Sequence, residues 1–205
     1  MSGSAGDSAH LVGGGAHLAG TGSIGELIVD GTVHPGAASN SVGTLDTGDV
    51  FLSPGGALRF DISQAAGTAG THWDLVDCTG SITVDATELT PFTVQVVGAP
   101  TGFDPSTSWS WKFIEASEGA VNGFAAAKFT TDATGFTSDM GGGAFTVVES
   151  GGDLYLEFQI PGVAVLGTNL ATIANGDVTP AAADGTDFGN VSIGGAELRT
   201  FFVTN

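Results

Sequence analysis

The sequence is short of cysteine, of positive charge and of long apolar runs. Cys78 is the only cysteine among 205 residues, and four basic residues stand against 22 acidic ones, a formal net charge of −18. A single cysteine excludes an intrachain disulfide, and its apolar strand context predicts a buried, inert thiol. The scarcity of Lys and Arg argues against nucleic acid and anionic membranes as partners. No apolar run approaches 18 residues, so no membrane insertion is predicted.

Common catalytic motifs are also missing. The sequence has no G-x-S-x-G, H-E-x-x-H, C-x-x-C or phosphate-binding glycine loop. His72 and Asp74 would share one strand face with no serine or cysteine between them, so they do not predict a catalytic pair. His10 and His17 have too few neighbouring ligands for zinc, and we expect both to be exposed. We therefore expect no catalytic residue, no metal ligand set and no cofactor.

Acidic side chains leave two further alternatives open. The loop 177–187 has the composition of a calcium loop but not its D-x-D-x-D-G spacing, so we interpret its acids as solvated. Loosely bound Ca²⁺ is compatible with so acidic a surface. A carboxylate pair of a polysaccharide-cleaving enzyme also stays open, because facing acids in a β-helix come from different coils. The few cations argue against a lyase that acts on acidic sugars.

What the sequence does contain is glycine, 34 residues of it, between short apolar runs. Three segments align around Gly31, Gly55 and Gly80, namely ELIVDGTV, DVFLSPGGAL and LVDCTGSITV. Their spacing of about 24 residues is typical of one coil of a solenoid. Glycine at each bend allows a positive φ or a close backbone approach. The pattern predicts an all-β fold, a right-handed parallel β-helix, with an antiparallel sandwich as the alternative.

The segment after the repeats is aromatic. Trp109, Trp111 and Phe113 alternate onto one face of the predicted strand SWSWKFI. An exposed ladder of this kind would stack on sugar rings and bind a glycan, whereas a buried one would close the core. Residues 119–128 predict a short helical turn. The run AFTVVESGGDLYLEF predicts a β-hairpin, which we interpret as the C-terminal cap of the β-helix.

These boundaries divide the chain into three parts. Residues 1–23, rich in Gly, Ser and Ala, predict a flexible lead-in or a poorly specified first coil. Residues 24–160 form the predicted β-helix with its hairpin cap. Pro161-Gly162 marks a boundary, after which residues 161–205 change character. The start of the chain has no basic n-region and no apolar h-region, so it does not predict a signal peptide.

Two resemblances add to this reading. The runs VDGTVHPGAASNSVGTLDTGDVFLSPGGALRFDI and HWDLVDCTGSITVDA resemble the passenger repeats of autotransporter-like bacterial surface proteins, and the likeness extends over roughly residues 25–158. The tail resembles the opening of a choice-of-anchor D or hydin-like immunoglobulin-type module, through its NGD-x-TP turn, DGTDFG (184–189) and final F-x-V-x-N strand. The first implies a parallel β-helix secreted to, or displayed on, a bacterial surface. It implies no catalytic residues.

The tail would form an incomplete immunoglobulin-like segment. A sandwich of this type needs about seven strands, and residues 161–205 offer three or four. Its last strand would therefore be an apolar edge that pairs with another chain. The candidate inter-subunit strand residues are Leu198, Thr200, Phe201, Phe202 and Val203.

We therefore predict a non-catalytic, extracellular structural or adhesion module with a glycan or cell-surface ligand. Two alternatives remain open: a self-assembling homo-oligomer or fibre subunit, and a polysaccharide-binding or -cleaving protein.

Overall fold

The computed structural model describes residues 10–38, 40–117, 119–160, 162–173 and 177–204. These residues form strands, turns and one 3₁₀ turn, η1 (Ala126–Lys128), and contain no α-helix. The predicted all-β class is therefore confirmed, and η1 is what forms where a helical turn was expected. No helix in the described residues is long and apolar enough to cross a bilayer. The chain divides into two units, Met1–Ile160 and Pro161–Asn205.

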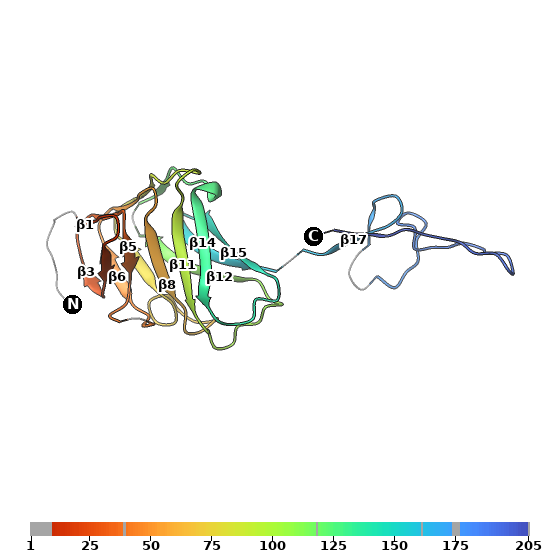
Figure 1. Cartoon of the computed structure of the whole chain (residues 1–205), viewed down its shortest axis with the longest axis horizontal. Helices are drawn as coiled ribbons and strands as arrows, with labels where there is room; N and C mark the ends of the chain where they lie inside the picture. The colour runs from red at the N-terminus through yellow and green to blue at the C-terminus, as the bar shows by residue number, and fades with distance from the viewer. Residues whose placement is uncertain (1–9, 39, 118, 161, 174–176, 205) are drawn as a thin grey trace. The chain divides into compact units, whose positions relative to one another are not determined.

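The first unit contains three sheets of stacked strands (Figure 1). The first sheet has the order β1 (His10–Val12), β4 (Leu27–Val29), β7 (Val50–Leu52), β10 (Ile82–Val84), β13 (Val121–Asn122). The second has the order β14 (Phe129–Phe136), β11 (Phe92–Gly98), β8 (Ala57–Asp61), β5 (Thr32–His34), β2 (His17–Ala19). The third has the order β15 (Ala144–Ser150), β16 (Asp153–Gln159), β12 (Trp109–Ala116), β9 (Leu75–Cys78), β6 (Thr44–Thr47), β3 (Gly22–Ser23).

From β1 to β12 the chain visits the three sheets in turn. Each strand then pairs in parallel with the strand laid down one round earlier in the same sheet. In the first sheet the offset between paired residues grows from 17 (His10 with Leu27) to 23 (Leu27 with Val50), 32 (Val50 with Ile82) and 39 (Ile82 with Val121). Within this sheet, the interval of about 24 residues between the glycines therefore matches only the pairing of β4 with β7. Gly80 lies between β9 and β10, a different pair of sheets from those joined at Gly31 and Gly55, and later rounds carry longer loops.

Parallel stacking brings apolar side chains of successive rounds into one interior. Leu27, Val50 and Ile82 are register partners in the first sheet and are almost fully buried. Val33 and Leu58 are likewise buried register partners in the second sheet. No round could bury these side chains alone, so each depends on its neighbour for a core.

Two of the repeated glycines fulfil the two roles predicted for them. Gly55 has φ +78°, a conformation that residues with a Cβ rarely adopt. At Gly31 a Cβ would lie 2.4 Å from the carbonyl oxygens of both Gly13 and Ala16, so the backbones of two rounds approach too closely for any side chain. The bends therefore need glycine for local reasons, whatever the length of the round.

Residues 10–23 pair with the next round. β1, β2 and β3 align in parallel with β4, β5 and β6. Residues 10–23 therefore supply the first round of strands. Residues 1–9 of the predicted lead-in lie outside the described residues.

The predicted hairpin is present at the other end of the unit. β15 and β16 pair antiparallel from Ala144 with Gln159 to Ser150 with Asp153. Gly151 and Gly152 both have positive φ (65° and 89°), as a two-residue turn of type I′ requires. β16 also pairs antiparallel with β12, so the hairpin ends the parallel stacking of the third sheet.

The second unit contains one small antiparallel sheet. Its order is β18 (Thr172–Ile173), β17 (Ala164–Leu166), β19 (Phe202–Thr204). Three short strands form here where an immunoglobulin-type sandwich would have two sheets. Most of the exposed large apolar side chains of the described residues belong to this unit, which gives it little core of its own.

Candidate functional site

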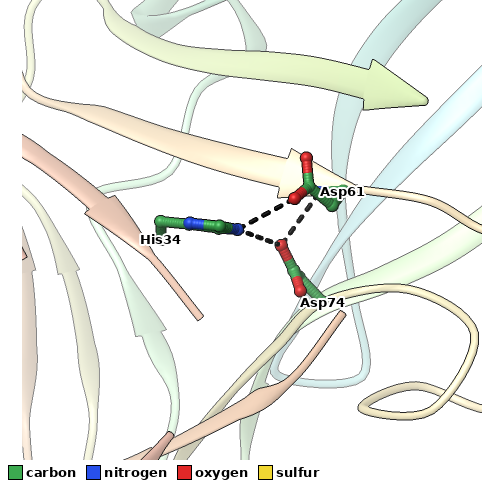
Figure 2. Close-up of side chains that lie close together, drawn as sticks. All are labelled: His34, Asp61 and Asp74. Atoms are coloured by element: carbon green, nitrogen blue, oxygen red, sulfur yellow. Dashed lines mark hydrogen bonds and ion pairs between the residues drawn. The ribbon is translucent and has the colours of Figure 1, made fainter. Parts of the chain in front are cut away.

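Three buried polar side chains meet on the second sheet, where β5 and β8 end (Figure 2). His34 ends β5 and Asp61 ends β8, and each follows a residue that points into the core, Val33 and Phe60. Alternation along a strand therefore turns His34 and Asp61 towards the opposite face of the sheet. Asp74 comes from the loop that leads into β9. The loops that follow β5 and β8 explain why these outward residues are nevertheless buried.

The three side chains are within reach of one another. His34 Nε2 lies 2.9 Å from Asp61 Oδ2 and 3.7 Å from Asp74 Oδ2. Because a carboxylate only accepts hydrogen bonds, Nε2 carries the proton in the shorter contact. Among the described residues this is the one group of His, Cys, Asp and Glu side chains whose ligand atoms all lie within 4.8 Å of one another.

Asp61 has a cationic partner as well. Arg59 Nε donates to Asp61 Oδ1 at 3.1 Å, and the same guanidinium donates to Asn40 Oδ1 at 2.6 Å. The arginine thus joins β8 to the loop after β5. Asp61 therefore has a charged partner on one side and an imidazole on the other.

Asp74 has a different environment, because its partners are backbone groups. Its Oδ1 accepts the N–H of Gly43 at 2.8 Å and its Oδ2 accepts the N–H of Asp61 at 2.9 Å. The side chain is fully buried. Burial raises the pKa of Asp74 to about 8, and Asp61 adds to the rise, although the two N–H donors and Arg59 lower it. Asp74 is therefore expected to be largely protonated at neutral pH.

The raised pKa of Asp74 predicts a pH dependence of stability. Between pH 3.8 and about 8 the folded chain holds a proton that the unfolded chain has lost, so the free energy of unfolding falls as pH rises across this window and then levels off. We expect Asp74→Asn to remove this slope, at a cost of about 1–3 kcal/mol because one N–H then faces an amide that cannot accept. Urea unfolding at half-unit pH steps, in buffer with a chelator, measures both quantities.

Asp77→Asn is the matched control, because Asp77 is a partly buried acid of the neighbouring strand β9. It should leave the slope of the wild-type chain intact. Equal slopes in the wild-type chain and Asp74→Asn would contradict a protonated Asp74.

Two surface hollows reach this cluster. One, of about 290 Å³, is lined by His34 and Arg59 together with His17 and Gln95. The other, of about 280 Å³, is lined by Asp61 and Asn40 among others. The cluster is thus buried but close to solvent on two sides, and the residues that could hold a metal there are His34, Asp61 and Asp74.

Comparisons with known proteins do not place the chain. No family model, no curated protein and no solved structure matches it.

The predicted aromatic ladder points mostly inwards. Trp111 and Phe113 are fully buried, and the indole N–H of Trp111 donates to the carbonyl of Ala65 at 2.9 Å. A buried ring offers no face to a sugar, so these two residues serve the core. Trp109 is partly buried, stacks on Trp111 and lines a hollow of about 400 Å³ together with Glu157. Trp109 is the only one of the three that is partly exposed, and both Phe103 and Trp111 stack on its ring.

The candidate inter-subunit strand lies at an edge. Phe202 and Val203 belong to β19, the edge strand beside β17, and both side chains are exposed. Leu198 and Phe201 precede this strand and are exposed too. Thr200 is exposed in the same approach to β19. All five residues of the predicted strand are thus at the surface of the second unit.

Among the described residues, the single cysteine and the other histidines lie outside the cluster. Cys78 is buried as expected; its Sγ lies 2.8 Å from the carbonyl of Gly48, and burial raises the pKa of its thiol. His17 is exposed as expected, and the side chain of His10 is outside the described part of the structure. His72 accepts the N–H of Thr68 through Nδ1 and does not join the cluster.

Sequence reasoning missed the cluster. It did not single out His34, and it weighed Asp74 only against His72. A usable signal was present, because aligning the repeats places His34 close to the charged pair Arg59 and Asp61 one round later.

Proposed function

We propose that this chain is a non-catalytic structural module of a bacterial surface or extracellular protein, built as a right-handed parallel β-helix. The observation that carries the proposal is the stacking of successive rounds in three sheets, with a shared apolar interior. Such stacking makes a stiff body whose stability does not depend on a ligand. The net charge of −18 favours solubility and suits contact with water and ions outside the cell.

The polar cluster agrees with a structural role. His34 and Asp61 are bonded to each other and to neighbouring loops, and no serine, threonine or cysteine side chain of the described residues is hydrogen-bonded to His34. A triad needs a nucleophile within reach of the base. The cluster holds the loops after β5 and β8 in place over the sheet.

The test is a glycan panel that includes neutral and uronic-acid polymers. We expect no new reducing ends and no unsaturated products after prolonged incubation with the full chain. Turnover that disappears in Asp61→Asn, but persists in Asp77→Asn, would overturn the non-catalytic proposal in favour of polysaccharide cleavage. Binding without turnover that is lost in Trp109→Ala would make the module a glycan-binding one.

Self-assembly is the second candidate function, and the exposed edge of the second unit favours it. β19 is an edge strand with exposed apolar side chains, which is the usual starting point for pairing between chains. Light scattering from micromolar to millimolar concentration measures it. We expect oligomers that Val203→Asp abolishes and that Leu89→Asp leaves unchanged, because Leu89 is exposed to a similar degree in the first unit. A chain that stays monomeric at every concentration in this range would contradict self-assembly.

A further inference from the structure

Asp74 differs from the other two side chains of the cluster in its hydrogen-bond partners. Asp74 accepts two backbone N–H groups, but no side chain of the described residues donates a hydrogen bond to it. Its nearest cationic candidate is His34 Nε2, at 3.7 Å. A fully buried carboxylate is costly unless it is neutralised by a proton, a cationic side chain or a metal.

The three facing atoms have the spacing of metal ligands. A zinc ion that binds N and O atoms at 2.0–2.2 Å places neighbouring ligand atoms roughly 2.8–3.6 Å apart for octahedral to tetrahedral angles. His34 Nε2 lies 2.9 Å from Asp61 Oδ2 and 3.7 Å from Asp74 Oδ2. The first distance lies within this range, the second lies just above it, and the ligand atoms of all three residues lie within 4.8 Å of one another, so modest side-chain shifts would let one ion bind all three.

We propose that His34 Nε2, Asp61 Oδ2 and Asp74 Oδ2 bind one divalent transition-metal ion of the zinc type. Figure 2 shows the three side chains converging on one point from two strand ends and a loop. This metal site does not depend on the proposed structural function, and its test is independent of that proposal. One imidazole and two carboxylates suit Zn²⁺ or a neighbouring transition metal. Ca²⁺ fits poorly, because it takes six to eight oxygen ligands at longer distances.

Binding requires one change of protonation at His34. In the metal-free cluster Nε2 donates its proton to Asp61, whereas a metal needs the Nε2 lone pair. The imidazole must therefore carry its proton on Nδ1 when the ion is bound, and any proton on Asp74 is released. Arg59 keeps its bond to the other oxygen of Asp61, Oδ1, and so orients that carboxylate without competing for Oδ2.

The ion would tie together segments that are far apart in the sequence. His34 and Asp61 are 27 residues apart, and Asp61 and Asp74 are 13 apart. An ion that binds only the folded chain raises its stability by mass action. The melting temperature of the first unit is therefore expected to rise with ZnCl₂ concentration and to return to its starting value with a chelator.

Calorimetric titration of ZnCl₂ into the chelator-treated full chain is the test. The wild-type chain should show one strong site, and His34→Gln and Asp74→Asn should each weaken it by at least about tenfold, since loss of even an outer partner of a metal ligand costs that much. His17→Gln and His72→Gln are the controls, because His17 is exposed, His72 is partly buried, and neither side chain joins the cluster. Far-UV circular dichroism checks that each variant is folded.

A second measurement needs no variant. In the ¹⁵N-labelled wild-type chain, the ring Nε2 resonance of His34 should move at the first equivalent of Zn²⁺, before those of His17 and His72. Weak, multiple sites that persist in His34→Gln, or a His34 resonance that stays in place at one equivalent, would overturn the proposal and assign the zinc to the acidic surface.

Discussion

Replacing Trp111 with alanine is expected to lower the free energy of unfolding of the first unit by about 3–5 kcal/mol. Trp111 is the largest of the fully buried side chains, so its removal leaves a cavity that the neighbouring strands can fill only in part. The carbonyl of Ala65 also loses its indole donor and stays buried. Urea unfolding, followed by circular dichroism and by the fluorescence of Trp73 and Trp109, measures the loss in this unit alone.

Two further variants make the Trp111 result interpretable. Trp111→Phe keeps most of the ring but loses the N–H, so a smaller cost of about 1–2 kcal/mol is expected. Leu89→Ala truncates a side chain that is 97% exposed and should change stability by no more than about 0.5 kcal/mol. A cost for Trp111→Ala as small as that of Leu89→Ala would mean that the ring lies at the surface, where it could meet a sugar.

Local patterns predicted the local features of the fold. The turn Gly151-Gly152 between two alternating runs was sufficient to predict the β15–β16 hairpin, because such a turn has few other solutions. Alternation along β12 placed Trp111 and Phe113 on one face. The sequence could not decide whether that face was covered, because coverage depends on the hairpin strand β16 and on loops distant in the chain.

The repeats in the sequence did not predict that successive rounds of the chain become longer. Three aligned segments gave a nearly constant spacing, yet the paired residues show offsets that more than double along the first sheet. Strand pairing in a parallel sheet depends on which residues face inwards, and loops of any length can connect such strands at the surface. The spacing of the glycines therefore locates the bends of the chain, but it does not predict which residues of neighbouring strands pair.

The candidate site was likewise predictable only in part from the sequence. His34 and Asp61 end register-related strands, so a correct repeat alignment brings them near each other. Asp74 belongs to a loop whose path no periodicity describes, and its carboxyl oxygens accept the N–H groups of Gly43 and Asp61. Sequence patterns could therefore have suggested a polar pair at this point, but not the third side chain that makes it a ligand set.

Gly31→Ala is expected to detach the first round of strands from the second. The new Cβ would lie 2.4 Å from the carbonyl oxygens of Gly13 and Ala16, and these are backbone atoms that cannot move without breaking the pairing of β2 with β5. Overpacking of this kind costs about 1–3 kcal/mol where side chains can adjust, so at least the upper end of that range is expected here. Gly13→Ala is the matched control, because a Cβ at Gly13 meets nothing within 4 Å.

Native-state hydrogen exchange separates local detachment from global unfolding. If the rounds stack as separate layers, amides of β1 and β2 should lose protection in Gly31→Ala, while those of β11 and β12 keep it. The reason is that β11 pairs with β8 and β14, and β12 pairs with β9 and β16, strands that come after the first two rounds. Uniform loss across both groups would mean that the unit unfolds as one block. Wild-type protection throughout would mean that the close approach at Gly31 does not limit how the first two rounds pack. The outcome therefore decides whether each round of strands can unfold separately from the others, as the proposed β-helix requires.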